Sequence, residues 1–197
     1  MSKMIAPFIQ GNLLYLRSIE RGDLVSLAEW LNDSDVTRLL FMGLLPTNVE
    51  MLTAQWERDR NNADEVAFAV CDANTGAFVG TTGLYRIHWV MRTAEFRVFL
   101  GDKRVWNGGI GTECAKRMAV YGFEKLNLNK VWLGVNAENL GGVRAYEKAG
   151  FVHEGVLRQE QYRNFRYYDA IRMSMLRSEY ELVREAYLRP GAMAAAK

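Results

Sequence analysis

Cysteine, histidine and long apolar runs are scarce in this sequence, and each absence excludes a class of protein. The two cysteines, Cys71 and Cys114, fall on apolar faces of predicted elements without redox or metal-binding spacing, which fits a reducing compartment. The two histidines, His88 and His153, are too few and too isolated for a metal site, so we expect no metal. No run of about 18 apolar residues is present, and the N-terminal segment lacks the apolar core of a signal peptide. We therefore expect a cytoplasmic protein that does not span a membrane.

Neither positive nor negative charge is in large excess. The 25 lysines and arginines nearly balance 23 aspartates and glutamates, and a net charge of +2 gives no strong attraction to nucleic acid or anionic membranes. Residues 158–172 are rich in arginine and tyrosine and could form a stacking and phosphate-binding surface for RNA. Glu160 and Asp169 weaken that interpretation, and tyrosine is common in edge strands. We do not expect direct nucleic-acid binding, but a ribosome- or RNA-associated binding module stays the alternative function.

The length and composition are those of a single folded domain. Of the 197 residues, 49% are hydrophobic and 24% are charged, which is ordinary for a domain that buries a core. Alternating apolar residues and turn signals predict seven strands, within 14–17, 65–72, 76–90, 94–101, 130–135, 151–161 and 165–176. Helical spacing predicts four helices, at 24–31, from Pro46–Thr47 onward with Thr47 and Glu50 as a capping box, after 109 and at 139–148. This order predicts an α+β (mixed α/β) domain.

The stretch 36–46, between the first two predicted helices, is rich in apolar residues but has no clear period. Core packing explains such a segment. So does a mobile wall over an acceptor pocket, because apolar loops beside clefts often form such walls. The sequence leaves both interpretations open.

A glycine-rich turn, WNGGIGT at 106–112, joins the strand 94–101 to the following helix. Glycines ahead of a helix expose backbone N–H groups, which together with the helix dipole can bind a phosphate or pyrophosphate. The turn lacks the Gly-Lys-Ser/Thr end of a P-loop, and Cys114 stands where a dinucleotide fingerprint needs its third glycine. By itself the motif fits a phosphate site and a simple tight turn equally well.

A second motif, NLGGVRAYEKAGF, begins at Asn139. Asn139 and Tyr146 lie seven residues apart, about two helical turns, so their side chains share a face. Alone, this spacing is more typical of a core tyrosine than of a site. Arg144 and Lys148 on the same helix could reach a phosphate or form a solvated face.

Together, the strand ending in FLG, the turn GGIGTE and the motif NLGGVRAYEKAGF make the sequence resemble the GNAT superfamily of acyl-CoA N-acyltransferases. The resemblance covers about residues 12–178, and the closing segment 155–180 is similar to the branch that includes acetyltransferases of ribosomal-protein N-termini. It implies a GNAT-like domain over 12–180, with about four helices flanking a mostly antiparallel sheet of about seven strands that splays between strands 4 and 5. Residues 1–11 are then expected to be an N-terminal extension, and 181–197 a helix end with a disordered tail.

The resemblance also implies acetyl-CoA as co-substrate. The turn backbone would hold the CoA pyrophosphate, and the strand end around Leu100 would pair with the pantetheine arm and polarise the thioester carbonyl. Asn139 would contact the cofactor, and Tyr146 would lie near its sulfur. Trp106 stands where Gln or Arg is common, and Gly142 where Ser is common, so one phosphate donor and one hydroxyl contact are in doubt. The full expected binding set is Phe99, Leu100, Trp106, Asn107, Gly108, Gly109, Ile110, Gly111, Thr112, Asn139, Gly142 and Tyr146.

Acetyl transfer from a thioester to an amine needs a neutral amine, a polarised carbonyl and protonation of the departing thiolate. Tyr146 is the candidate acid, because phenol and thiol pKa values of about 10 and 8.5 are close. No cysteine or serine is placed beside a base, so we expect direct attack in a ternary complex. Glu95 is the candidate base, on the strand expected to flank the cleft, where superfamily members commonly use an acid. A solvated or cross-strand-paired carboxylate is the alternative for this residue.

The expected function is therefore acetyl-CoA-dependent N-acetylation of a primary amine. The acceptor is expected to be a protein N-terminal α-amine or a small amine, such as a polyamine, an amino sugar, an amino-sugar nucleotide or an aminoglycoside. Acidic residues in the pocket would favour a polycation. A homodimer is a further expectation from the resemblance.

Overall fold

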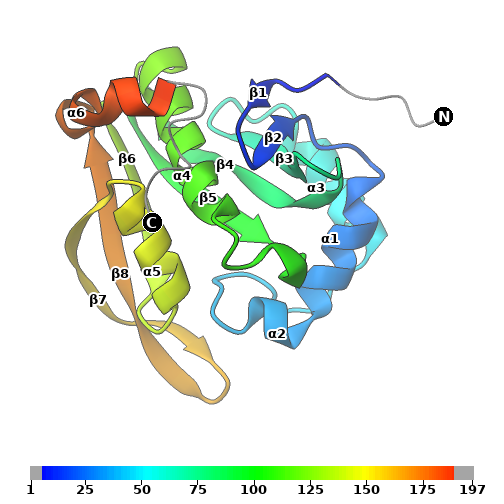
Figure 1. Cartoon of the computed structure of the whole chain (residues 1–197). Helices are drawn as coiled ribbons and strands as arrows, with labels where there is room; N and C mark the ends of the chain where they lie inside the picture. The colour runs from blue at the N-terminus through cyan, green and yellow to red at the C-terminus, as the bar shows by residue number, and fades with distance from the viewer. Residues whose placement is uncertain (1–5, 189–197) are drawn as a thin grey trace.

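An eight-stranded sheet organises the computed structural model, which describes residues 6–188 (Figure 1). The strands follow the order β1-β2-β3-β4-β5-β6-β8-β7, and every neighbouring pair is antiparallel except β5 and β6. The expected α+β fold with a mostly antiparallel sheet is confirmed, with one strand more than predicted. The strands are β1 Ile9–Gln10, β2 Leu14–Arg17, β3 Val66–Asp72, β4 Phe78–His88, β5 Thr93–Leu100, β6 Lys130–Asn136, β7 Val152–Arg163 and β8 Arg166–Leu176.

The additional strand, β1, lies in the segment 1–11 expected as an extension. The backbone N–H of Phe8 donates to Leu16 at 2.8 Å, and the Phe8 ring stacks on Phe68 with centroids 5.5 Å apart. A strand of two residues is too short to show an alternating pattern, so its pairing was not predictable from sequence period.

Six α-helices lie within the described residues, two more than expected. The four-residue helix α2 begins just before the stretch that showed no period and overlaps its first two residues. Helix α6 closes the described chain, and the helix end expected from residue 181 belongs to it. A 3₁₀ turn, Lys103–Val105, precedes α4, and a π-helical turn, Tyr121–Lys125, extends it. The α-helices are α1 Asp23–Asn32, α2 Ser34–Thr37, α3 Val49–Asp59, α4 Ile110–Val120, α5 Leu140–Lys148 and α6 Arg177–Leu188.

Helix α3 is capped by Asn48, so the expected capping box of Thr47 and Glu50 is wrong. The Asn48 side chain accepts a hydrogen bond from the backbone N–H of Met51 at 2.8 Å, which satisfies one free N–H group of the first turn. Thr47 is bound before the helix begins, because its backbone N–H and C=O both bond to the side chain of Asn32.

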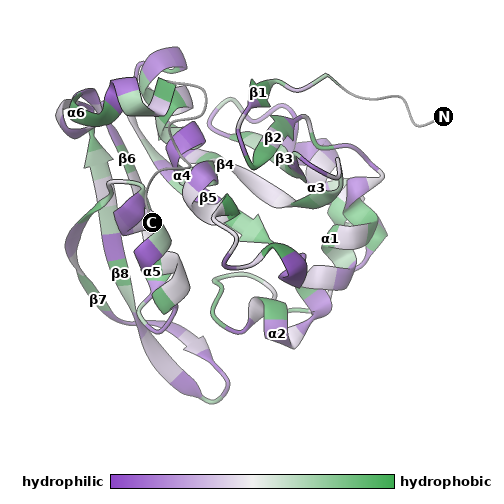
Figure 2. Ribbon diagram, viewed as in Figure 1, coloured by the Kyte–Doolittle hydropathy of each residue, from purple (hydrophilic) through white to green (hydrophobic). Residues whose placement is uncertain are grey.

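Helices cover both faces of the sheet, and β5 contributes to both cores. Phe96 packs in the larger core, with α4, α5 and α6, whereas Phe99 packs on the other face with α1, α2 and α3. The Trp30 ring of α1 lies 6.3 Å from that of Phe99. Figure 2 shows polar residues on the outer surfaces of these helices, as expected for a sheet sandwiched between amphipathic helices.

The sheet opens between β5 and β6. These two parallel strands pair over only three positions, ending at Glu95 opposite Trp132, although β5 continues to Leu100 and β6 to Asn136. Figure 1 shows the two halves of the sheet diverging, with α4 and α5 at the opening. The splay expected between strands 4 and 5 of the predicted set is therefore confirmed. It leaves backbone groups at the end of β5 without a partner on β6.

The described chain ends in α6. Tyr180 is fully buried and stacks on Phe123 with ring centroids 4.8 Å apart, and the Tyr187 hydroxyl donates to the carbonyl of Ala149 at 2.5 Å. The helix thereby fixes the end of α5. The expected disordered tail is a prediction that falls on residues 189–197, outside the described residues.

Both cysteines are free and buried, as the apolar faces around them predicted. None of the helices among residues 6–188 combines the length and apolar character needed to cross a membrane.

Candidate functional site

The turn between β5 and α4 has the backbone geometry of an anion-binding helix start. Gly109, the residue before α4, has φ of +90°, where a side chain would be strained, and it offers no side-chain cap. The first N–H groups of α4 therefore have no partner within the helix or from a cap. At Gly111, in the first turn, the nearest atom that a Cβ would meet is the Leu100 side chain at 3.9 Å. The backbone here is open to the approach of a phosphate.

Glu113 fixes the start of this helix in place. Its buried carboxylate accepts hydrogen bonds from the backbone N–H groups of Asn12 at 2.6 Å and Leu13 at 2.7 Å, and it pairs with Arg117. The glutamate that ends the motif GGIGTE thus ties α4 to the turn before β2. Its role is to position the helix, because none of its bonds reaches the cavity described next.

Trp106 joins the turn to the end of β5. Its indole Nε1–H donates a hydrogen bond to the backbone carbonyl of Leu100 at 2.9 Å. An arginine or glutamine at this position would offer a side-chain donor to a phosphate. The tryptophan instead uses its one donor to hold the strand end and the turn together, so the doubt raised by the sequence about a phosphate contact here is supported.

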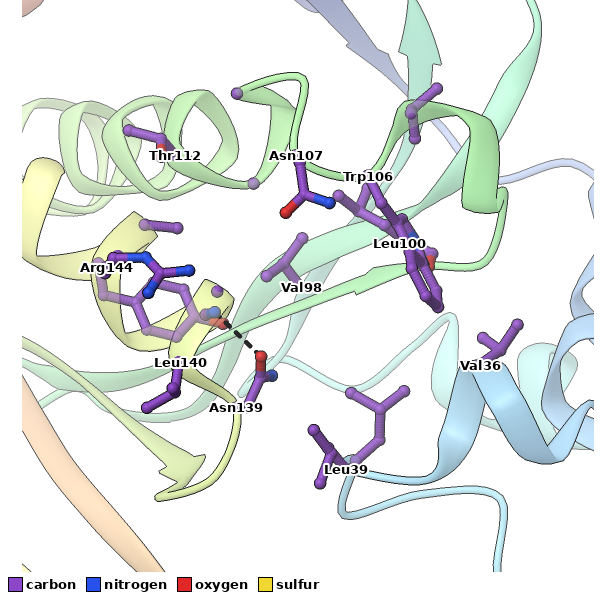
Figure 3. Close-up of a pocket in the computed structure, with 18 of the residues that line it drawn as sticks. Val36, Leu39, Val98, Leu100, Trp106, Asn107, Thr112, Asn139, Leu140 and Arg144 are labelled. Carbon is purple, nitrogen blue, oxygen red and sulfur yellow. Dashed lines mark hydrogen bonds between the residues drawn. The ribbon is translucent and has the colours of Figure 1, made fainter.

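A cavity of about 550 Å³ lies where β5 and β6 separate, and it collects most of the predicted site residues (Figure 3). Leu100 comes from β5, and Asn139, Gly142 and Tyr146 come from the start and body of α5. Three expected residues do not line it: Phe99 and Ile110 are buried in the two cores, and Gly108 is turned outward. These three could reach a ligand only through their backbones. The turn contributes Trp106, Asn107, Gly109, Gly111 and Thr112.

Asn139 caps helix α5. Its side-chain oxygen accepts a hydrogen bond from the backbone N–H of Gly142 at 3.0 Å, the contact drawn in Figure 3. A Cβ at Gly142 would lie 2.9 Å from the Asn139 amide nitrogen, so the glycine lets this cap close without displacement. This explains the absence of serine there, and a side-chain hydroxyl contact from this position is excluded.

Tyr146 is held by aromatic neighbours at the inner end of the cavity. Its ring meets Phe96 edge-on with centroids 5.9 Å apart and Phe151 at 6.4 Å. Burial, with a smaller contribution from Cys114, raises the pKa of the phenol, so Tyr146 is protonated at neutral pH. No hydrogen bond joins its hydroxyl to another described residue. Tyr146 lines the cavity, and its role as a proton donor stays a prediction.

Glu95 lies outside this cavity lining. Its carboxylate, 14% exposed, pairs with Arg97 of the same strand at 2.7 Å and with Arg86 of β4 at 3.5 Å. It stands at the last paired position before the sheet opens. The paired state that the sequence left as an alternative is thus present, and the role of Glu95 as a base stays a prediction.

The wall opposite the glycine turn comes from the stretch 36–46, for which the sequence left core packing and a wall over an acceptor pocket both open. None of its residues was in the predicted binding set. Val36, Leu39 and Leu40 of the apolar stretch 36–46 line the cavity, and Figure 3 shows Val36 and Leu39 across from Leu100 and Trp106. Val98 was also missed, although the alternation along β5 puts it on the same face as Leu100. The wall residues had no such signal, because their stretch has no period.

Some of the charged residues that line the cavity are unpaired, and others form ion pairs. Arg144 and Lys148 line it, and neither side chain bonds or pairs with another described residue, so both are available to a phosphate. Asp35 pairs with Lys103 at 3.2 Å, and Glu138 pairs with Arg166 at 2.7 Å. Residues 6–188 contain no group of three or more His, Cys, Asp or Glu side chains arranged to hold a metal ion.

The chain is similar to known proteins over most of its length. The family model described as "Acetyltransferase (GNAT) domain" matches residues 14–152. A spermidine N(1)-acetyltransferase of Vibrio cholerae is 34% identical over 167 residues, covering 85% of this chain and 95% of that protein. An enzyme of the same description from Escherichia coli K12 is 35% identical, covering 84% and 87%. The crystal structure of spermidine N-acetyltransferase from Vibrio cholerae with CoA and spermine superposes with a TM-score of 0.79 at 32% identity, covering 86% of this chain and 98% of that one.

Proposed function

Because this chain belongs to the GNAT family and is an acetyl-CoA-dependent N-acetyltransferase, we propose that its acceptor is the primary amine of a small molecule. Family membership confirms the resemblance on which acetyl-CoA was expected. The enzymes of Vibrio cholerae and Escherichia coli described above act by name on spermidine, a small amine. A binding module without acetyl transfer is not favoured.

One observation supports acetyl transfer in this cavity: the opening between β5 and β6 joins a turn suited to an anion to a protonated tyrosine. The exposed N–H groups at the start of α4 suit a pyrophosphate. The end of β5, which pairs with β4 but not with β6, suits the amide-bearing pantetheine arm. Tyr146 lines the same cavity from the α5 side. Acetyl-CoA supplies an acetyl group activated as a thioester.

We infer that the reaction is direct attack in a ternary complex. The amine nitrogen forms a bond to the acetyl carbon, and the carbon–sulfur bond breaks. The proton of Tyr146 goes to the departing sulfur, and the proton lost by the amine goes to a base. Cys114, whose pKa burial raises, is completely buried and does not line the cavity, which argues against an acyl-cysteine intermediate.

An acceptor panel tests this function. Spermidine, glucosamine, an aminoglycoside, a lysine analogue and a ribosomal-type N-terminal peptide are each incubated with acetyl-CoA and protein, and thiol release and product mass are measured. We expect an N-acetylated small amine and no acetyl-protein. Stoichiometric acetyl-protein formed from acetyl-CoA alone would contradict direct attack, and acetylation of the peptide alone would contradict a small-molecule acceptor.

Replacement of Glu95 by Gln tests the proposed base. Deprotonating a lysine-like amine of pKa about 10.4 at pH 7 costs about 4.6 kcal/mol, whereas an α-amine near 7.8 costs about 1.1 kcal/mol. Glu95→Gln is therefore expected to lower kcat/KM by about 10²-fold or more for the more basic amine and by much less for an α-amine. Glu57→Gln is the control, because Glu57 is an exposed carboxylate of α3 that also pairs with an arginine, Arg21. An equal loss with both amines would show that Glu95 acts only through its pairing with Arg97 and Arg86.

A further inference from the structure

A second cavity, of about 520 Å³, adjoins the first. It lies between the apolar stretch 36–46 and the tip of the hairpin formed by β7 and β8, which contributes Tyr162 and Phe165. Arg38 lines both cavities, so the two meet at this residue. This second cavity is large enough for the part of an acceptor that does not react, while its amine reaches the first.

The charged residues lining the second cavity are all positive. Arg38 and Arg163 line it, and no aspartate or glutamate is among the described residues that do. Arg163 is 8% exposed, and its guanidinium donates hydrogen bonds to the backbone carbonyls of Leu40 at 3.1 Å and Met42 at 3.0 Å, and also to those of Thr37 and Gly43. It has no carboxylate partner among residues 6–188. Its charge is therefore not neutralised by an acid.

Arg163 also shapes the wall that both cavities share. Its four carbonyl partners lie within residues 37–43, and Gln161 donates to the carbonyl of Leu40 while accepting from Asn136 of β6 at 2.7 Å. The segment is thus bound to the β7–β8 hairpin rather than left free. Arg38 is carried on this fixed segment, and its exposed side chain bonds to no other described residue.

The two carboxylates that line the first cavity are already paired. Asp35 pairs with Lys103, and Glu138 pairs with Arg166, both on the side of the first cavity. A polyamine would bring a second positive charge close to Arg38 and Arg163 and find no free carboxylate on the lining. An oxyanion would meet an unpartnered guanidinium, which suits carboxylate and phosphate geometry.

We propose, on the basis of the function proposed above, that the acceptor is a primary amine that also carries an oxyanion, and that Arg38 binds this group. The amine enters the first cavity beside Tyr146, and the oxyanion stays at the junction of the two cavities. In this respect the chain differs from its relatives named for spermidine. Carboxylate and phosphate share the recognition chemistry, and the experiment separates them.

Matched amines that differ in charge test the proposal. The kcat/KM for acetylation is measured with 4-aminobutyrate, butylamine and 1,4-diaminobutane, which share a four-carbon chain, and with glucosamine and glucosamine 6-phosphate. In each set, the amine that carries an anionic group is expected to have a kcat/KM at least about tenfold higher than the amine without one. The diamine is expected to have the lowest kcat/KM. Preference for 4-aminobutyrate alone identifies a carboxylate, and preference for the sugar phosphate alone identifies a phosphate.

Two substitutions assign the preference to Arg38. Arg38→Met is expected to reduce the ratio of kcat/KM for the anionic amine over the diamine by at least about tenfold, and Arg38→Glu to invert it. Arg58→Met removes an equal charge from α3, which lines neither cavity. It is expected to leave the ratio of kcat/KM for the anionic amine over the diamine as it is in the unmodified protein. Thermal unfolding of each variant verifies that it is folded.

The outcomes separate this proposal from the one on which it rests. If no small amine of either panel is acetylated, the proposed acceptor class fails. If amines are acetylated but spermidine or the diamine is preferred, the proposed function stands and the oxyanion is excluded. A preference for anions that Arg38→Met and Arg38→Glu leave unchanged would assign the recognition to another residue and overturn the role of Arg38.

Discussion

Replacing Tyr146 with Phe is expected to lower kcat by about 10²- to 10⁴-fold, while the Kd for acetyl-CoA changes little. The ring is fixed by Phe96 and Phe151, and phenylalanine keeps those contacts. The hydroxyl bonds to no other described residue, so its loss removes no internal hydrogen bond. What the substitution removes is the proton for the departing thiolate. Steady-state kinetics and equilibrium binding of acetyl-CoA measure the two quantities separately.

The pH profile supplies a second readout for Tyr146. Burial raises the pKa of this phenol, so it keeps its proton as pH rises through the neutral range. Activity is expected to increase from pH 6 to 9 as the amine loses its proton, with no decline caused by Tyr146 in that interval. A decline that disappears in Tyr146→Phe would mean that the phenol ionises far below the range its burial implies.

Tyr121→Phe is the matched control. Tyr121 is also a partly buried tyrosine whose pKa is raised by burial, and it packs on Phe68 away from the cavity. Its substitution is expected to leave kcat within about twofold. Equal losses in Tyr146→Phe and Tyr121→Phe would indicate a general packing defect and contradict proton donation by Tyr146.

Replacing Gly111 with Asp is expected to abolish acetyl-CoA binding without harming the fold. The nearest atom to a Cβ here is 3.9 Å away, so the side chain fits. A carboxylate in the first turn of α4 interacts favourably with the helix dipole by about 0.3–1 kcal/mol. Two like charges about 5 Å apart repel by about 3 kcal/mol at an effective dielectric constant of about 20, which weakens pyrophosphate binding by more than about 100-fold.

This substitution is informative because it is expected to stabilise the apo protein slightly while it weakens acetyl-CoA binding. The apo protein is expected to unfold at the same temperature or up to a few degrees higher, whereas the stabilisation by acetyl-CoA expected for the unmodified protein is lost. Gly111→Asn is the neutral control of nearly equal size and is expected to retain much tighter binding than Gly111→Asp. Equal affinities for the Asp and Asn variants would mean that no phosphate lies near this turn.

Elements with local signals were predictable from the sequence. The turn that contains Gly109 was expected to bind a phosphate because glycines ahead of a helix expose backbone N–H groups. Asn139 and Tyr146 were expected on one face because the helical period depends only on their spacing. The splay of the sheet came from the family resemblance, since no local pattern reports that two parallel strands part after three pairs.

The acceptor side depends on contacts between distant segments, and these were missed. Arg163 donates hydrogen bonds to carbonyls more than 120 residues earlier in the chain. No sequence pattern around Arg163 or in the stretch 36–46 indicates that the two segments make contact. Acidic residues in the pocket were expected to favour a polycation acceptor, but the sequence did not show which side chains line it. In the folded chain Asp35 and Glu138 are paired, and that fact needs the three-dimensional arrangement.

Phe99 shows a second limit of sequence patterns. It was expected in the cofactor set because it neighbours Leu100, yet its side chain packs with α1 on the other face of the sheet. The alternation of β5 could have indicated Val98 instead, which does line the cavity. A strand at the opening of a sheet presents its backbone to a ligand, whatever its side chains face, so residue identity alone does not decide which residues bind.

Backbone hydrogen exchange with and without acetyl-CoA is the most direct test of whether the cofactor binds where β5 and β6 separate. Binding is expected to slow exchange at the end of β5, around residues 96–101, at the turn and first helical residues 106–113, and at the start of α5, around 139–146. These are the segments whose N–H groups or side chains form the cavity. Slower exchange confined to other segments, such as the β7–β8 hairpin, or no change at saturating acetyl-CoA, would contradict cofactor binding at this opening.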